Sequence, residues 1–304
     1  MADFDLHILG CGSALPTMRH LATSQIVNLR DKLYMIDCGE GTQVQMRRAR
    51  IKFSRLNHIF ISHLHGDHCF GLPGLISTLG MLGRRGPLFI HGPKEVEDYL
   101  RPVLNRFCAG LAFEVVFNSV DTRKHAPVME DRSLKVWSIP LKHRIPTCGF
   151  LFEEKTEADH LIREMADFYQ IPVSLRRAIK QGDDYVTPEG ELIPHARLTR
   201  PSKPPKRYAY CSDTAFAPEI APIIKGVDLL YHEATFIEAD IARARQTAHS
   251  TAAQAALIAR QADVKRLVIG HFSARYEDDD VLRREACGIF PGTILAREGL
   301  ALQV

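Results

Sequence analysis

The sequence lacks any apolar run long enough to cross a membrane, which requires about 20 consecutive residues. Residues 1–6 also lack the basic stretch followed by an apolar stretch that directs a protein to export. These absences argue against membrane and secreted classes. We therefore expect a soluble protein that is not exported.

The cysteines lack the paired CxxC spacing of redox and zinc-ribbon motifs, and all seven are scattered through a chain too long to need disulfide staples. We expect reduced, mostly buried thiols, which suit the cytoplasm. A large charge imbalance is absent too, because 39 Lys and Arg residues face 36 Asp and Glu residues, for a net charge of +3. Overall charge does not indicate a nucleic-acid-binding protein, so any basic surface must be local.

The chain has the composition of an ordinary globular protein, with 304 residues, 45% hydrophobic and 25% charged. Apolar strands alternate with helical stretches, which predicts an α/β layered domain. The predicted strands are 6–9, 24–29, 32–36, 58–61, 88–91, 113–117, 135–139, 207–211, 227–231 and 266–269. The predicted helices are 43–48, 71–82, 93–104 and one that begins near 249–251, with Ser250 or Thr251 as its N-cap.

The most informative stretch follows one of these strands and contains His63, His65, Asp67 and His68. Three imidazoles and a carboxylate within six residues suit zinc or a similar divalent ion better than calcium or magnesium. We expect Gly66 to allow backbone angles that fold these groups toward one point. Four such close ligands fit two neighbouring ions better than one. The alternative is a histidine-rich surface turn.

Other polar groups also come directly after predicted strands, so we expect them to meet at one edge of the sheets. They supply His63, His65, His143 and Asp213 for one ion, and Asp67, His68, His271 and Asp213 for the other. In this assignment the Asp213 carboxylate bridges the two ions. Asp37 stands at another strand end, where it either orients a ligand histidine or serves as a turn or helix-cap residue.

Two ions about 3.5–4 Å apart can activate a water between them and stabilise both oxygens of an in-line displacement at phosphorus. The predicted chemistry is hydrolysis, in which Asp67 takes the proton of the attacking water. Glu233 and His249 are not needed as ligands. A carboxylate beside an imidazole keeps it protonated, so His249 is a candidate acid for the leaving oxygen.

Residues 153–200 read as an insertion of helices and a hairpin, acidic at first and then basic at Arg176, Arg177 and Lys180. A Lys and Pro-rich stretch over 200–207 follows. This arm could hold a large substrate, or it could be a surface excursion or a dimer contact. The basic run over 47–55 is either a solvated face or a phosphate-contact patch.

The chain resembles ribonuclease Z, the short-form tRNA 3′-processing endonuclease family of the metallo-β-lactamase superfamily. His-x-His-x-Asp-His alone indicates only the superfamily. The more specific motifs are Asp37-x-Gly-Glu-Gly-Thr-Gln, Ser-Asp213-Thr, His-Glu233-Ala-Thr, His249-Ser-Thr and Gly-His271-Phe-Ser-Ala-Arg275-Tyr. The match extends from Leu9 to beyond Tyr276.

This resemblance implies a single domain over 1–304 with a four-layer αββα sandwich and two zinc ions per subunit. It also implies a homodimer that cuts the 3′ trailer from precursor tRNA, leaving a 3′-hydroxyl on the tRNA and a 5′-phosphate on the trailer. The 153–200 arm would be the tRNA-binding exosite, with Arg176, Arg177, Lys180 and Arg275 as the RNA-binding residues. Family arms commonly carry a Gly-Pro-rich element, whereas this chain has Ile171-Pro-Val-Ser-Leu-Arg-Arg177.

Other functions compete with this one. The same ligands could serve a small-molecule phosphodiesterase or an arylsulfatase-like hydrolase. His65 argues against a di-iron oxygen-chemistry relative, and a thioesterase would have no use for His249 or the arm. A non-catalytic RNA-binding protein with structural zinc would leave Glu233 and His249 without a role, since structural zinc sites are closed by four protein ligands.

Overall fold

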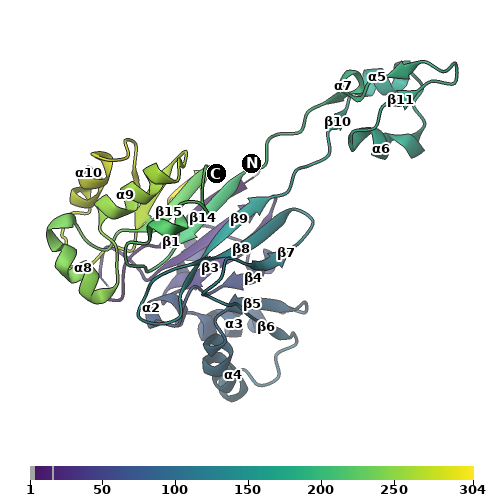
Figure 1. The fold of residues 1–304 in the computed structure, drawn as a ribbon. Helices are drawn as coiled ribbons and strands as arrows, with labels where there is room; N and C mark the ends of the chain where they lie inside the picture. Colours follow the sequence, from purple (N-terminus) through teal and green to yellow (C-terminus); the bar gives the residue numbers. More distant parts are fainter. Residues whose placement is uncertain (1–3, 16) are drawn as a thin grey trace. The chain divides into compact units, whose positions relative to one another are not determined.

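The computed structural model describes residues 4–15 and 17–304. These residues form two compact units (Figure 1). The second unit contains Arg132–Leu134 and Glu154–Pro205, and the first contains the other described residues. The two units are described separately below.

The first unit contains two seven-stranded mixed sheets. The order of the first sheet is β18 (Ala301–Gln303), β1 (Phe4–Gly10), β2 (Ser24–Leu29), β3 (Lys32–Cys38), β4 (Leu56–Phe60), β5 (Leu88–Gly92) and β6 (Val115–Ser119). The order of the second is β17 (Ile294–Leu295), β16 (Leu267–Gly270), β15 (Leu229–Glu233), β14 (Arg207–Cys211), β9 (Cys148–Glu154), β8 (Leu134–Pro140) and β7 (Pro127–Glu130). Strands β3 to β6 are parallel, and so are β14 to β17.

The two sheets pack face to face through buried aromatic side chains. Phe60 of β4 lies 5.3 Å, centroid to centroid, from both Phe150 and Phe152 of β9. The hydroxyl of Tyr210 on β14 donates to the Asp37 carboxylate on β3 at 2.7 Å. Alternation along each strand thus places one set of side chains between the sheets and the other set under helices.

Helices cover the outer face of each sheet. On the first sheet these are α1 (Thr42–Arg48), α3 (Leu72–Met81) and α4 (Glu95–Phe107), and their buried side chains share one apolar cluster with β2 to β5. On the second sheet α9 (Ala252–Gln261) contacts β15 and β16, and α10 (Asp280–Cys287) packs on α9. The short helices are α2 (Gly66–Cys69) and α8 (Ile241–Thr247). This arrangement confirms the predicted αββα layers.

The second unit has a small core of its own. Its hydrogen-bonded strand pairs are β10 (His160–Leu161) with β13 (Thr199–Arg200), and β11 (Tyr185–Val186) with β12 (Leu192–Ile193). Its helices are α5 (Arg163–Phe168), α6 (Arg176–Lys180) and α7 (His195–Leu198). The core residues are Ala166, Ile171, Ile179, Tyr185, Ile193 and Leu198.

The structure confirms every predicted strand of the first unit, with β6 and β15 each two residues later than predicted, so that His232 and Glu233 lie within β15 and not after it. Thr251 is the N-cap of α9, in a capping box with Gln254. The sequence interpretation missed β9, which begins at Cys148 directly after the turn that follows His143. Within the described residues, no helix is long and apolar enough to span a membrane.

A buried histidine, His91, paired with the half-buried His58, gives the fold a predictable response to acid. His91 stacks on Phe60, and its Nε2 lies 3.1 Å from Nδ1 of His58. Burial, and then the neighbouring His58, lower the pKa of His91 to about 3. Below pH about 6.5 the His91 ring is protonated in the unfolded chain but stays neutral in the folded chain.

Because of His91, we therefore expect the free energy of unfolding to fall by about 1.4 kcal/mol for each pH unit below about 6.5. His91→Phe keeps the stacked ring and should flatten the pH dependence of the denaturation midpoint between pH 7 and pH 5. His160→Phe, at an exposed histidine, is the control. An unchanged slope in the His91 variant would contradict this account.

Candidate metal centre

Polar side chains from both sheets of the first unit meet where their strands end. His63 and His65 follow β4, and Asp67 and His68 lie in the short helix α2 that comes next. From the second sheet, His143 follows β8, Asp213 follows β14 and His271 follows β16. The structure thus brings together all seven residues that the sequence predicts as ligands.

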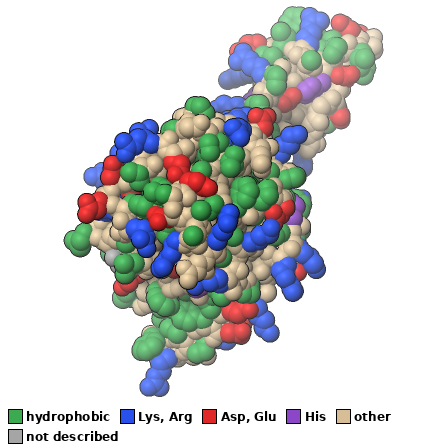
Figure 2. All heavy atoms as spheres, turned by 60° about the vertical axis from the view of Figure 1, so that its left-hand side comes forward, with side chains coloured by type: hydrophobic (Ala, Val, Ile, Leu, Met, Phe, Trp, Pro, Cys, Tyr) green, Lys and Arg blue, Asp and Glu red, His purple; other side chains and the backbone are tan. Residues whose placement is uncertain are grey.

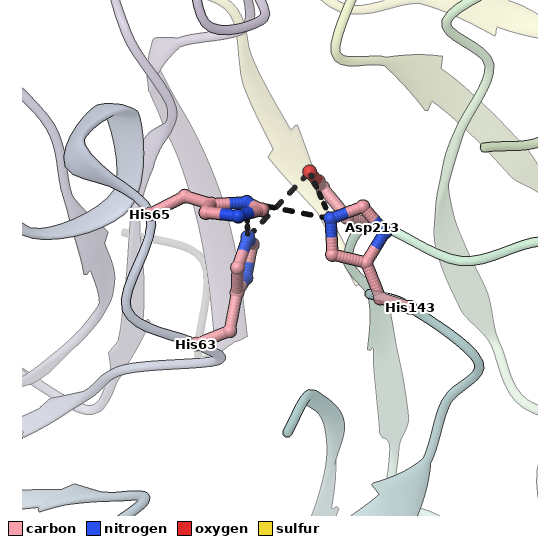
Figure 3. Close-up of side chains that lie close together, drawn as sticks. All are labelled: His63, His65, His143 and Asp213. Atoms are coloured by element: carbon pink, nitrogen blue, oxygen red, sulfur yellow. Dashed lines mark hydrogen bonds and ion pairs between the residues drawn. The ribbon is translucent and has the colours of Figure 1, made fainter. Parts of the chain in front are cut away.

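The first group contains three imidazoles and one carboxylate, which point toward one another in Figure 3. His65 Nδ1 lies 3.0 Å from His63 Nε2 and 3.3 Å from His143 Nε2. Oδ2 of Asp213 lies 3.6 Å from His63 Nε2 and 3.8 Å from His143 Nε2. Ligand atoms around a tetrahedral zinc ion are separated by about 3.3 Å, given metal–ligand bonds of about 2.0–2.1 Å.

The second group uses the other oxygen of the same carboxylate. Asp213 Oδ1 lies 3.4 Å from His68 Nε2 and 3.2 Å from His271 Nε2. Oδ2 of Asp67 lies 3.3 Å from each of these two nitrogens. Asp213 therefore faces one group with each oxygen, as a carboxylate that bridges two ions must.

The donor atoms fit metal ions in two further respects. His68 Nε2 and Asp213 Oδ1 are buried and have no hydrogen-bond partner. The second ring nitrogens of four of the histidines, which are His63, His68, His143 and His271, face oxygen atoms, as those of metal-bound imidazoles usually do. His143 Nδ1 lies 2.9 Å from the carbonyl oxygen of Ala248, and His271 Nδ1 lies 2.9 Å from Thr235 Oγ1.

The electrostatics favour ligand protonation states in the first group. Burial lowers the pKa of His63, His65 and His143, so each ring is neutral and has a free lone pair. In the second group burial lowers the pKa of His68, but the carboxylates of Asp67, Asp213 and Asp37 outweigh burial and raise it, so a metal ion there would displace a proton from this ring. Burial alone would raise the pKa of Asp67, but the nearby His68 and His271 rings lower it, so the group stays a carboxylate. Neutral imidazoles and ionised carboxylates are the forms that bind a cation.

Asp37 holds the second group in place. Its carboxylate, fully buried, lies 2.8 Å from His68 Nδ1 and accepts hydrogen bonds from Ser62 and Tyr210. Helix α1 instead begins after Gly41, without a side-chain cap. Of the two roles that the sequence left open for Asp37, the structure therefore supports the orienting one. The positive φ of Asp37 (53°) turns this strand end toward the cluster.

Glu233 and His249 lie beside the seven residues. Glu233 Oε1 is 2.9 Å from His249 Nδ1, and this buried carboxylate also accepts backbone hydrogen bonds from Thr214, Thr235 and Ser250. Burial favours the neutral ring of His249, but the Glu233 charge and hydrogen bond outweigh it and raise the pKa of His249 to about 9. The imidazole is thus a protonated group at neutral pH.

Gly66 corrects one detail of the sequence interpretation. Its φ is not positive, so the turn needs no unusual backbone angle there. A Cβ at this position would instead lie 2.4 Å from the Phe70 ring. Glycine provides space rather than conformational freedom.

The sequence interpretation also missed two supporting residues, Tyr210 and Thr235. Thr235 belongs to a quoted motif, which was a usable signal, whereas Tyr210 lies on a strand of the other sheet, which no local pattern indicates. His232 of the same motif is fully buried, and its Nδ1 faces the carbonyl oxygen of Glu233.

Two open cavities adjoin the cluster. One of about 730 Å³ is lined by His65, Asp67, Leu21, Phe70 and Arg144 among others. The other, of about 840 Å³, is lined by His143, Arg144, Lys94 and Arg123 among others. One cavity thus borders His65 and Asp67, the other borders His143, and Arg144 lines both.

The predicted RNA-binding residues are divided between the two units. Arg275 is exposed in the first unit, while Arg176, Arg177 and Lys180 lie on α6 of the second. Arg177 and Lys180 are exposed, but Arg176 is half-buried and its Nε donates to the carbonyl oxygen of Ile171 at 3.2 Å. Arg176 thus has a contact within its own unit.

Comparison with known proteins identifies the family. The chain is 74% identical over 304 residues to the ribonuclease Z of Parabacteroides distasonis, and the match covers 100% of both chains. The chain belongs to the ribonuclease Z family. It is therefore a hydrolase of the endoribonuclease class. The model of a family described as anti-Pycsar protein Apyc1 also matches, over residues 4–161, a range that omits Asp213, Glu233, His249 and His271.

Solved structures show the same fold. Human tRNase Z, short form, has a TM-score of 0.71 at 24% identity, with 98% of each chain covered. The metallo-β-lactamase fold protein YhfI from Bacillus subtilis has a TM-score of 0.68 at 16% identity, with 98% of each chain covered. The predicted metallo-β-lactamase fold is confirmed.

Proposed function

We propose that this chain is a zinc-dependent endoribonuclease that removes the 3′ trailer from precursor tRNA. The cut leaves a 3′-hydroxyl on the tRNA and a 5′-phosphate on the trailer. The observation that carries the proposal is the Asp213 carboxylate, whose two oxygens face two separate groups of imidazole nitrogens. Family membership supplies the substrate class.

The seven clustered residues would hold two zinc ions, with His63, His65, His143 and Asp213 on one and Asp67, His68, His271 and Asp213 on the other. Bound there, the ions would activate water and neutralise charge on the phosphate. Asp67 borders the 730 Å³ cavity and is held ionised, so it can accept the proton of the attacking water. The chain itself thus provides the base.

His249 would act as the acid for the leaving oxygen. It is protonated at neutral pH through Glu233, and its ring centroid lies 5.1 Å from that of His143 and 5.3 Å from that of His271. The ring therefore borders both ligand groups. The 3′-oxygen of the tRNA is a poor leaving group as an alkoxide, so a proton delivered to it lowers the barrier. Glu233 is the positioning residue for this acid.

The exposed part of the site suits a single-stranded 3′ end. Phe70 borders the cavity at 63% exposure and offers a surface for base stacking, while Arg144 borders both cavities and can pair with phosphate. In the face shown in Figure 2, Lys and Arg side chains are scattered among acidic and apolar ones and form no single patch. Shape and a few local charges would then select the folded RNA.

We also propose that the 153–200 arm is the tRNA exosite, that the protein is a homodimer and that it works in the cytoplasm. Residues 154–205 carry eight Lys and Arg against nine Asp and Glu, so the exposed Arg177 and Lys180 would act locally. All seven cysteines are free, which suits a reducing compartment. Arg275 is the matching candidate on the first unit.

A small-molecule phosphodiesterase is the alternative, because the cluster itself does not specify the rest of the substrate. The first test is cleavage of a precursor tRNA by the zinc-loaded protein beside its His65→Ala variant, with both product ends mapped. We expect a cut next to the acceptor stem that leaves a 3′-hydroxyl and is lost in the variant. Hydrolysis of a small phosphodiester without any cut in the tRNA would favour the alternative.

If His249 is the acid, its removal should lower kcat only for substrates whose leaving group needs a proton. His249→Ala should lower kcat on precursor tRNA by about 10²–10⁴-fold. It should leave turnover of bis(4-nitrophenyl) phosphate nearly unchanged, because nitrophenolate leaves without a proton. For the unsubstituted protein, kcat on tRNA should fall as the pH rises through about 9, where His249 loses its proton. The control is His125→Ala, at an exposed ring, and equal losses on both substrates would refute the assignment.

If the arm binds tRNA, substitutions in it should weaken the binding of precursor tRNA but not the turnover of a small substrate. Reversing both Arg177 and Lys180 to Glu should raise KM for precursor tRNA on the order of tenfold and weaken its salt dependence. Turnover of bis(4-nitrophenyl) phosphate should not change. Arg163→Glu, where the guanidinium already faces Asp167 at 3.7 Å, is the matched control within the same unit. A KM for tRNA that stays constant would exclude this surface as the exosite.

A further inference from the structure

A second cluster of metal-type donors lies in the first unit, outside the seven residues described above. It contains Cys11 and His20, from the loop between β1 and β2, and Glu298, from the turn between β17 and β18. Cys11 is fully buried, and the His20 and Glu298 side chains are only 10% and 16% exposed. The three ligand atoms come from opposite ends of the chain, so local sequence spacing gives no sign of the group.

The distances within this cluster are close to the separations between zinc ligands, and the Glu298 carboxylate faces the thiol with one oxygen and the imidazole with the other. Cys11 Sγ lies 3.4 Å from His20 Nδ1 and 3.7 Å from Glu298 Oε1, and His20 Nδ1 lies 3.2 Å from Glu298 Oε2. Zinc bonds of about 2.3 Å to sulfur and about 2.0–2.2 Å to nitrogen and oxygen imply separations of about 3.3–3.6 Å. One thiolate, one imidazole and one carboxylate are also a zinc-type donor set.

The surroundings orient the donors as second-sphere groups do at zinc sites. His20 Nε2 lies 2.6 Å from Asp279 Oδ2, so a carboxylate holds the far side of the ring and leaves Nδ1 facing Cys11. The backbone N–H of Leu21 donates to Glu298 Oε1 at 2.8 Å. The other oxygen of Asp279 is buried without a hydrogen-bond partner.

We propose that Cys11, His20 Nδ1 and a carboxylate oxygen of Glu298 bind a zinc ion at a third site, with water in the fourth position and Asp279 orienting the imidazole. The site shares no ligand with the paired centre and differs from it by its thiolate. The inference stands on this geometry alone and does not depend on the proposed RNA substrate.

The third ion would brace the loop that supports His271. The backbone N–H of Phe272 donates to the carbonyl oxygen of Cys11 at 3.0 Å, and that of Ser13 donates to the carbonyl oxygen of Phe272 at 3.1 Å. The His20 ring also packs against the Phe272 ring, with centroids 5.6 Å apart. A metal ion bound to Cys11 and His20 would thus fix the position of Phe272, the residue that follows His271. His271 itself has a positive φ of 64°.

The same contacts have a metal-free alternative. A protonated His20 held between Asp279 and Glu298 would form an ion-pair network, with Arg19 Nη1 at 3.5 Å from Asp279 Oδ2 as a further cation. The two arrangements differ in two measurable properties, which are the number of ions per chain and the presence of a metal–sulfur bond.

The test replaces zinc with cobalt in the full-length protein. The paired centre has only nitrogen and oxygen donors, so a sulfur-to-cobalt charge-transfer band in the near ultraviolet reports the third site alone. We expect this band together with three ions per chain by elemental analysis. Cys11→Ser should abolish the band and lower the content to two ions, while Cys108→Ser, at a cysteine outside the cluster, should change neither.

Glu298→Gln is the second variant, in case Cys11→Ser disturbs the buried loop. It keeps the thiol and should weaken cobalt binding at this site, so that the band saturates at a higher cobalt concentration. A wild-type protein that binds two ions without a sulfur band would overturn the proposal in favour of the ion-pair network. A band that persists in Cys11→Ser would overturn it as well.

Discussion

The carboxylate of Asp213 is the point on which the arrangement of both sheets depends. It follows a strand of the second sheet, while its two oxygens face His63, which follows β4 of the first sheet, and His68, which lies in α2 after that strand. A buried carboxylate is strongly disfavoured unless cationic partners surround it. The two sheets must therefore meet with these strand ends aligned, and the aromatic packing between Phe60, Phe150 and Phe152 maintains that alignment.

Much of this centre could be predicted from the sequence, because a simple rule holds throughout the chain. Each polar ligand comes shortly after a buried strand, and strands that run in the same direction bring such positions to one edge of a sheet. That rule locates His143, Asp213 and His271 without any motif. It does not reach Tyr210, whose hydroxyl meets Asp37 across the space between the sheets, because the register of two packed sheets is a tertiary property.

At Gly66 and Arg176 the sequence interpretation failed because the deciding contact forms only in the folded protein. Gly66 was expected to supply backbone freedom, but the constraint is the Phe70 ring, which lies four residues further along and meets it only once α2 has formed. Arg176 looked equivalent to Arg177, yet its guanidinium contacts the carbonyl oxygen of Ile171. Charge can be read from a sequence, whereas the availability of that charge depends on packing.

His249 illustrates how the fold separates a proton donor from a ligand of the same type. Its Nδ1 lies 3.9 Å from Asp213 Oδ2, so by distance alone the His249 ring could be a metal ligand. The same nitrogen is only 2.9 Å from Glu233 Oε1. The proton that Glu233 stabilises on Nδ1 occupies the lone pair that a metal ion would need. Glu233 thereby prevents His249 from binding a metal ion through Nδ1. The backbone N–H groups of Thr214, Thr235 and Ser250 hold the Glu233 carboxylate in place.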